Sequence, residues 1–178
     1  EDKVQVLANF SFIPASITQN LTVLSLFTPF SYNFLHGGWV HLFFNAVMGL
    51  ALGTFVERMF STPTVIKFYF ICGVAGALIF LIFHPFTQIP LIGASASISG
   101  LFAASMMMLY EQGRLGAVAR GLQKKGLKGY WPMVIIWAVI MSVFGMLSGG
   151  NVAWQAHLGG YLCGALLYHF MRKGKIRL

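Results

Sequence analysis

Five long apolar stretches, joined by connections that are alternately uncharged and basic, constrain the fold of this 178-residue chain more than any other feature. They run over residues 38–56, 64–83, 94–110, 131–147 and 153–171. A helix that crosses a bilayer needs about 20 apolar residues, with about 17 near the lower limit. Only 9% of the residues are charged, whereas a soluble domain carries about 25%. The chain is therefore predicted to be all-α, a polytopic membrane helix bundle.

The positions of the basic residues predict the orientation of these helices. No Lys or Arg lies between Lys3 and Arg58, or within 84–93 and 148–152. The other connections and the C-terminal tail are basic, as cytoplasmic segments of membrane proteins are. The first, third and fifth stretches are therefore predicted to enter from the outer side, in a multi-pass protein of a bacterial inner (cell) membrane.

Residues 1–35 are apolar and aromatic, but Pro14 and Pro29 interrupt them. This segment is predicted to be a structured loop in the outer interface, and the whole of 1–178 to be a single domain. The N-terminus lacks the basic start and apolar core of a cleavable signal peptide, which is consistent with a chain that begins partway through a longer protein.

Composition and motifs exclude several function classes. The net charge is +8, but the basic residues lie at the ends of apolar stretches, without the interleaved aromatics of a nucleic-acid site. Cys72 and Cys163 lie within apolar stretches and are predicted to be free thiols. No Walker, GxGxxG or HExxH motif is present. We therefore expect neither a nucleic-acid partner nor a cofactor.

Polar residues inside apolar helices are costly and are therefore the most informative residues of this chain. They cluster at the outer ends of the helices that enter from outside, about one to two turns deep at 1.5 Å per residue. Because they lie at similar depth, they can meet. The cluster contains His36, His41, Asn45, Ser95, Ser97, Ser99, Gln155 and His157.

Ser95 and His157 form a candidate catalytic pair. A serine hydroxyl becomes a good nucleophile when a base removes its proton, and histidine is the side chain that titrates closest to neutral pH. The alternative is that Ser95 caps its helix and His157 is a packing residue. Asp and Glu occur only at positions 1, 2, 57 and 111, so serine chemistry here would use a dyad without a carboxylate.

His41 and Asn45 are one helical turn apart and share a face of the first helix. Both can donate hydrogen bonds to an oxyanion, as can the backbone N–H of Ser95 at its helix N-terminus. His36 could support this site or line a water-filled entrance. A purely structural role for His36 is an equal alternative. A zinc site made by three histidines, His36, His41 and His157, is a further alternative.

The three serines of residues 95–99 are not equivalent. Ser99 lies one turn after Ser95 and returns to the same face, which makes it a candidate neighbour of His157. Ser97 points to nearly the opposite side and is predicted to be a packing residue.

Four segments carry a resemblance to a known family: "FLHGGWVHLFFN" with His41 and Asn45, "GTFVERMFS", "GASASISG" with Gly93 and Ser95, and "AHLGGYLCG" with His157. In this order and topology they resemble the rhomboid intramembrane serine proteases. The resemblance covers about residues 10–170.

The resemblance implies a six-helix core whose first helix is missing ahead of residue 1. It also implies a shorter fourth helix that carries Ser95 opposite His157, with His41 and Asn45 at the oxyanion. The implied activity is hydrolysis of substrate transmembrane segments near their outer end, through an acyl-enzyme and without a cofactor. The implied partners are single-pass or polytopic membrane proteins and the lipid bilayer.

The chain departs from the family pattern at three places. The glycine that follows the nucleophile is Ala96, the Trp-Arg pair of the first outer loop is absent from 10–35, and Ser99 occupies a position that is aromatic in some members. Two other functions stay open at this point. One is an inactive rhomboid-like protein that binds or escorts transmembrane clients, and the other is a small-solute channel lined by His36, His41 and His157.

Overall fold

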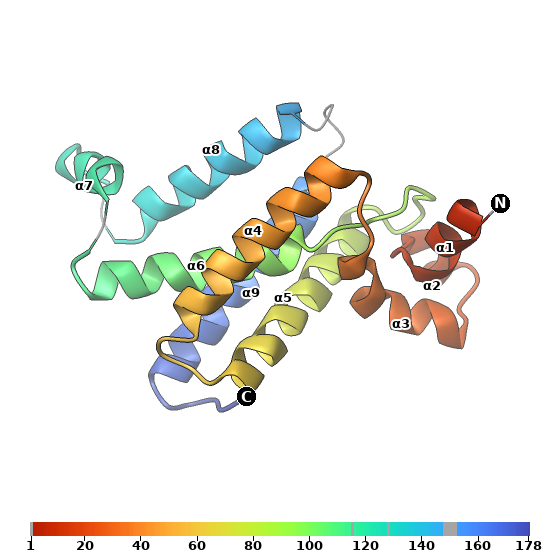
Figure 1. The fold of residues 1–178 in the computed structure, drawn as a ribbon, viewed down its shortest axis with the longest axis horizontal. Helices are drawn as coiled ribbons and strands as arrows, with labels where there is room; N and C mark the ends of the chain where they lie inside the picture. Colours follow the sequence, from red (N-terminus) through yellow and green to blue (C-terminus); the bar gives the residue numbers. More distant parts are fainter. Residues whose placement is uncertain (1, 115, 128, 148–152) are drawn as a thin grey trace.

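The computed structural model of the protein describes residues 2–114, 116–127, 129–147 and 153–178. Within them the fold is all-helical, and the one β-type pairing is an isolated bridge between Phe12 and Leu91. The elements in chain order (Figure 1) are α1 (Asp2–Phe10), α2 (Pro14–Thr18), α3 (Val23–Ser31), η1 (Tyr32–Phe34), α4 (Trp39–Val56), α5 (Thr62–Phe83), α6 (Ser95–Glu111), α7 (Ala117–Lys124), α8 (Trp131–Leu147) and α9 (Trp154–Arg172).

Each of the five predicted apolar stretches contains a helix, and the ends differ from the predicted ones by two residues at most. The largest difference is at the start of α5, which begins at Thr62. Pro63 lies in its first turn, where a proline is favourable because the N–H that it lacks would have no helical partner.

Among the described residues, α4 and α5 are long and apolar enough to cross a membrane, with mean hydropathies of 1.6 and 2.4. The protein is a membrane protein with apolar helices. The helices α6 and α8 are shorter, with 17 residues each, and α9 carries Gln155 and His157 near its start. The candidate nucleophile lies on α6 and the candidate base on α9, α8 contacts Ser99 of α6, and the predicted oxyanion residues lie on α4.

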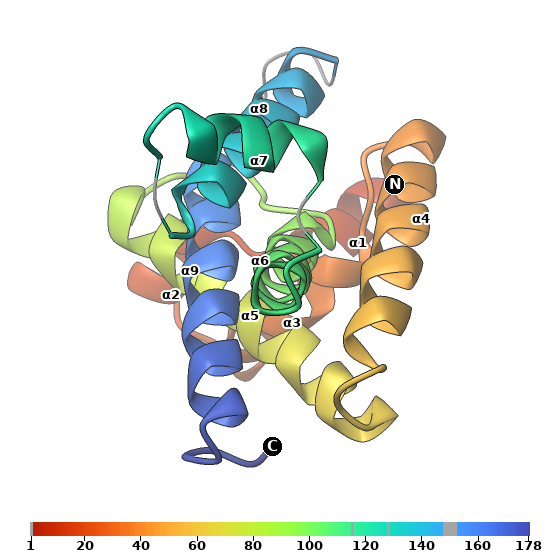
Figure 2. The same ribbon diagram turned by 90° about the vertical axis from the view of Figure 1, so that its left-hand side faces the viewer.

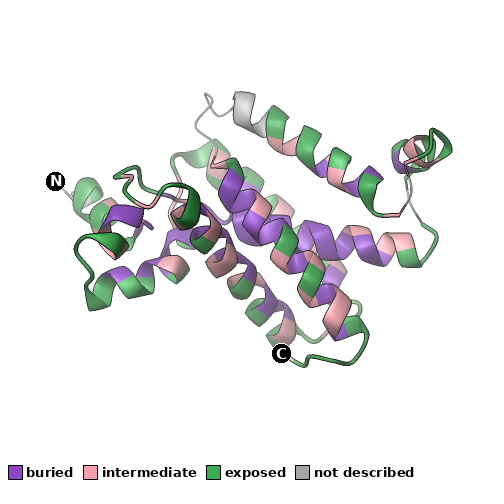
Figure 3. Cartoon of the chain, turned by 180° about the vertical axis from the view of Figure 1, so that it is seen from behind, coloured by how far each residue is buried: buried purple, intermediate pink, exposed green. Residues whose placement is uncertain are grey.

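The helix α6 lies at the centre of the bundle. Figure 2 shows it end-on, with α4, α5 and α9 around it. Residues 96–105 are all buried, which makes α6 one of the most continuously buried segments in Figure 3. Most of these residues have small side chains, so neighbouring helices approach its backbone closely. The candidate nucleophile is the first residue of this central helix.

Glycines set the distance between α6 and α9. A Cβ atom on Gly160 would overlap the carbonyl oxygen of Ala96, and one on Gly164 would overlap the backbone of Gly100. The two helices therefore meet backbone to backbone along this line. Because Gly160 follows His157 by about one turn and Ala96 follows Ser95, this contact also sets the separation of the two candidate catalytic residues.

The N-terminal segment, predicted to be a loop, is folded mainly into the short helices α1, α2 and α3. One reason is local: Thr22 and Ser25 form a reciprocal capping box that starts α3. The segment is attached to the bundle through the Tyr32 hydroxyl, which donates to the Gly73 carbonyl at 2.8 Å. Its outward residues include the exposed aromatic side chains of Phe27 and Phe30, as expected for a segment in the membrane interface.

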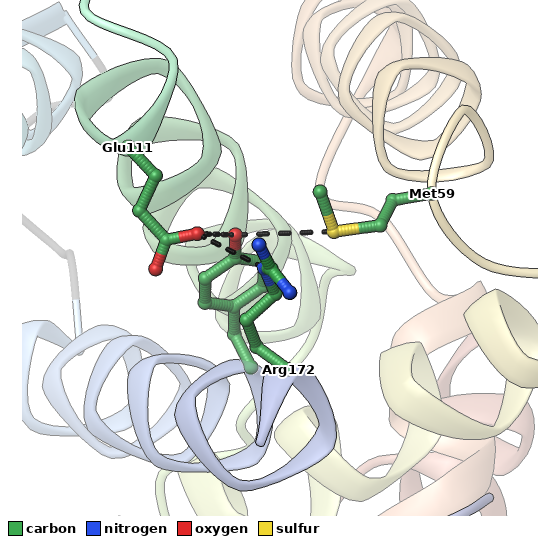
Figure 4. A network of polar contacts seen from close by, with 4 residues as sticks. Met59, Glu111 and Arg172 are labelled. Carbon is green, nitrogen blue, oxygen red and sulfur yellow. Dashed lines mark hydrogen bonds and ion pairs between the residues drawn. The ribbon is translucent and has the colours of Figure 1, made fainter. Parts of the chain in front are cut away.

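A polar network ties together the opposite end of the bundle (Figure 4). The Glu111 carboxylate, at the end of α6, accepts hydrogen bonds from the Tyr168 hydroxyl at 2.8 Å and from Arg172 Nε at 3.3 Å. The same hydroxyl lies 3.9 Å from the sulfur of Met59, just after α4. The network therefore links α6, α9 and the turn that follows α4.

Candidate active site

Ser95 and His157 lie in hydrogen-bonding contact. The Ser95 hydroxyl is 2.7 Å from His157 Nε2. His157 Nδ1 lies 3.0 Å from the Ala153 carbonyl, one turn earlier in α9. A proton on Nδ1 donates to that carbonyl and leaves the Nε2 lone pair facing the serine hydroxyl. The N-cap position of α6 is occupied by Ala94, so Ser95 is not the capping residue and its hydroxyl is directed at the histidine.

The turn before Ser95 is fixed by Gly93. Its φ is +109°, a conformation that residues with a side chain rarely adopt. Its N–H donates to the Tyr32 carbonyl at 3.0 Å. A Cβ at Gly93 would lie 2.8 Å from the ring of His41 and 3.6 Å from Asn45 Nδ2. The turn thus brings the start of α6 against the two predicted oxyanion residues, which come from α4.

His41 and Asn45 present hydrogen-bond donors near this turn. The Gly37 N–H donates to His41 Nδ1 at 3.4 Å, which places the ring proton on Nε2, on the edge of the ring that faces Gly93. Asn45 is 9% exposed, and its Nδ2 is a buried donor without a hydrogen-bond partner. A buried donor without a partner is unfavourable unless a ligand or water completes it.

A cavity of about 290 Å³ adjoins these residues. Its lining includes Asn45 from α4, Ala94 from the turn before Ser95, and His36 and Phe34 from the segment that leads into α4. The two imidazole rings of His36 and His41 meet edge to face at 5.0 Å. Burial lowers the pKa of His36, and a hydrogen bond to the Phe34 backbone partly opposes this shift. Burial thus favours the neutral form of the His36 ring that lines the cavity.

The other two serines of this stretch have structural partners. Ser97 is fully buried and its hydroxyl donates to Asn33 Oδ1 at 2.7 Å, so it connects α6 to η1. The Ser99 hydroxyl donates to the Ser95 carbonyl at 2.9 Å and accepts from Trp137 Nε1 at 3.3 Å. Ser99 thus connects the first turn of α6 to α8.

Two contacts at this site were not predicted from the sequence. One is the Ala153 carbonyl that orients His157, because a backbone acceptor leaves no signal in residue types. The other joins Gln155 Nε2 to His84 Nε2 at 2.7 Å. Gln155 was singled out as a polar residue near the start of α9, and its buried amide was the signal that a partner existed. His84 is the residue that follows the last residue of α5.

The three-histidine zinc alternative gains no support from the geometry. Among the described residues, no group of three His, Cys, Asp or Glu side chains is arranged to hold a metal ion. What the arrangement offers is a hydroxyl, a base that faces it, and donors from α4 beside the turn that precedes the hydroxyl.

The family model described as "Rhomboid domain" matches residues 23–174. This chain belongs to the rhomboid family. The match begins at the start of α3 and includes α4 to α9. All residues of the site described above therefore lie within the rhomboid domain.

Two curated rhomboid relatives come from Bacillus subtilis (strain 168). The Rhomboid protease GluP is 31% identical over 130 residues, which cover 73% of this chain and 23% of GluP. YdcA, which is named for the same protease family, is 28% identical over 137 residues, which cover 77% of this chain and 62% of YdcA. The chain thus spans less than two thirds of each relative. No solved structure gives a significant match to the chain.

Proposed function

We propose that this rhomboid family member is an intramembrane serine endopeptidase with Ser95 as nucleophile and His157 as general base. The observation that carries the proposal is the 2.7 Å contact between the Ser95 hydroxyl and His157 Nε2. The carboxylate nearest to either residue in the sequence is Glu111, which is bonded to Tyr168 and Arg172 at the other end of α6. The Ala153 carbonyl takes the orienting role that an aspartate has in a triad.

The chemistry follows from the placement of these groups. His157 accepts the hydroxyl proton as Ser95 Oγ attacks the scissile carbonyl carbon, and the carbonyl oxygen becomes an oxyanion. His41 Nε2, Asn45 Nδ2 and the Ser95 N–H stabilise this charge. Collapse of the intermediate breaks the C–N bond, and His157 gives its proton to the leaving amine. Water, deprotonated by His157, then hydrolyses the acyl-enzyme and releases Ser95.

The proposed substrates are transmembrane segments of membrane proteins, cut near their outer end. The hydrophobic surroundings of α6 favour a substrate that is itself apolar, and family membership supports this class. The basic connections support a position in a bacterial inner membrane with the site near the outer side. The proposed architecture is one rhomboid-like domain over residues 1–178, with a six-helix core and no cofactor.

The dyad is tested with the full chain in lipid, a model single-span substrate and a fluorophosphonate probe. We expect two fragments from a cut near the outer end of the substrate, and probe labelling at Ser95. His157→Gln removes the base and should slow labelling at least about a hundredfold. Labelling at the original rate in His157→Gln would contradict the dyad, and substrate binding without cleavage by the unaltered chain would favour the escort function.

Asn45→Ala removes one donor to the oxyanion. We expect kcat to fall about a hundredfold, with KM changed little, because the donor acts on charge that appears in the transition state. Val47→Ala is the matched control: this residue lies on the same helix, is 46% exposed, and its variant should keep the original kcat. If the two variants have equal kcat, Asn45 does not stabilise the oxyanion.

Gln155→Leu breaks the hydrogen bond to His84 near the start of the helix that carries His157. A hydrogen bond of this kind contributes about 1 kcal/mol, so we expect kcat to fall about five- to tenfold. His84→Phe should have a similar effect, and the double variant should be no worse than either single one. Gln155→Glu, whose carboxylate can accept from a His84 ring N–H, should recover most of the activity. Additive losses would show that the two residues act independently.

A further inference from the structure

The connection between α6 and α8 is strongly basic. Residues 112–130 contain Arg114, Arg120, Lys124, Lys125 and Lys128, and no Asp or Glu. The preceding carboxylate, Glu111, is bonded to Tyr168 and Arg172 of α9. No acidic residue follows Glu111 in the sequence, so this connection creates a positive potential that its own residues do not neutralise.

The helix α7, within this connection, is amphipathic. Arg120 and Lys124 are one turn apart and share one face, whereas Val118, Ala119 and Leu122 lie on the other. Ala119 is 3% exposed and packs against Met133 of α8. Val118, beside it, is 68% exposed. One face of α7 is therefore cationic, and the other is apolar but only partly covered by protein.

Aromatic residues place the two ends of the connection at headgroup depth. The rings of Tyr110, at the end of α6, and Tyr130, before α8, meet at 4.9 Å. Trp131, the first residue of α8, is 65% exposed. Tyrosine and tryptophan gather where the hydrocarbon core meets the headgroups. Because both ends of the 112–130 connection lie at headgroup depth, the helix α7 within it stays close to the headgroups.

The direction of α7 agrees with this depth. In Figure 1 the helix α7 is seen end-on, whereas α4 and α9 are seen from the side. In Figure 2, after a turn of 90°, α7 is seen from the side. The helix α7 therefore runs across the direction of the long helices and along the membrane surface.

We propose that α7 is a surface helix that binds anionic phospholipid headgroups. The Lys and Arg side chains bind lipid phosphates, and Val118 and Leu122 enter the boundary of the acyl chains. A lipid fits better than a soluble phosphate compound because the apolar and cationic faces lie on one helix at the membrane surface. The binding does not depend on the proposed protease activity.

The test uses the full chain in nanodiscs that contain a photoactivatable phosphatidylglycerol or the equivalent phosphatidylcholine, followed by mass spectrometry of the labelled peptides. We expect phosphatidylglycerol to label the 112–131 peptides at least about threefold more than phosphatidylcholine does, relative to peptides of the exposed face of α4. Raising the salt concentration should reduce this preference. A preference that is absent, or that salt leaves unchanged, would overturn the proposal.

Matched charge variants localise the effect. Arg114→Gln, Lys124→Gln and Lys125→Gln together remove three charges from the connection, and Lys173→Gln, Lys175→Gln and Arg177→Gln remove three from the C-terminal tail. The first set should abolish the preference at 112–131, and the second should leave most of it. An equal loss in both would indicate an effect of net charge alone. Loss of labelling in the presence of soluble glycerol phosphate would identify a free phosphate site. Either result would overturn the proposal.

Discussion

Ser95→Ala should abolish proteolysis and probe labelling, with kcat lower by at least about a thousandfold. The reason is chemical: the variant keeps the helix and the neighbouring His157 but has no oxygen that can attack a carbonyl. The measurement is fragment release from a reconstituted transmembrane substrate, together with covalent labelling by a fluorophosphonate. The alanine should fold normally, because it is a favourable residue in the first turn of a helix.

Ser97→Ala is the matched control for this experiment. Ser97 is two residues away on the same helix, and its hydroxyl is bonded to Asn33 Oδ1. Its loss leaves one buried acceptor without a partner, which costs about 1–3 kcal/mol of stability, and the labelling rate of the folded fraction should not change. Labelling that persists in Ser95→Ala, or that disappears in Ser97→Ala at equal folding, would mean that the nucleophile is misassigned.

Gly160→Ala should have the largest effect on stability. The added Cβ would overlap the Ala96 carbonyl oxygen, and because this oxygen belongs to the backbone of the central helix, α6 and α9 must separate. Overpacking of this kind costs about 3 kcal/mol. The displacement also separates Ser95 from His157, so the labelling rate should fall together with the midpoint of unfolding in detergent.

Gly53→Ala provides the matched control for the glycine experiment. Gly53 lies within α4, and a Cβ there would have no atom within 4 Å. The same substitution should therefore stabilise the protein by about 0.5–1 kcal/mol through helix propensity. If Gly160→Ala and Gly53→Ala unfold at the same midpoint, the close approach of α6 and α9 is not required for stability.

The long helices were predictable because length and hydropathy are properties of a single segment. Pro63 moves the start of α5 by two residues, which shows the scale of the local corrections. The short helices were not predicted, because each depends on a cap or on a partner. The reciprocal bonds of Thr22 and Ser25 start α3, and the Ala119–Met133 contact holds α7 against α8.

In the candidate site, too, the depth of a residue was predictable from the sequence, whereas its side-chain partners were not. Depth in the membrane placed Ser95 and His157 at a similar level, because residue position and rise per residue determine depth. Side-chain partners depend on how helices are rotated about their axes, and this rotation is set by tertiary packing. The sequence therefore left Ser99 as a candidate neighbour of the base, whereas the structure bonds its hydroxyl to Trp137 of α8.

The alanine that follows the nucleophile has a consequence for how this sequence can vary. Ala96 is 2% exposed; a Cβ on Gly76 would lie 2.6 Å from its methyl group, and one on Gly160 would overlap its carbonyl oxygen. Positions 76, 96 and 160 therefore share one small volume. The contact at position 76 involves the Ala96 side chain, so related chains that carry alanine at position 96 should keep glycine at position 76. The contact at position 160 involves only the backbone of residue 96, so glycine should be kept there whatever residue follows the nucleophile.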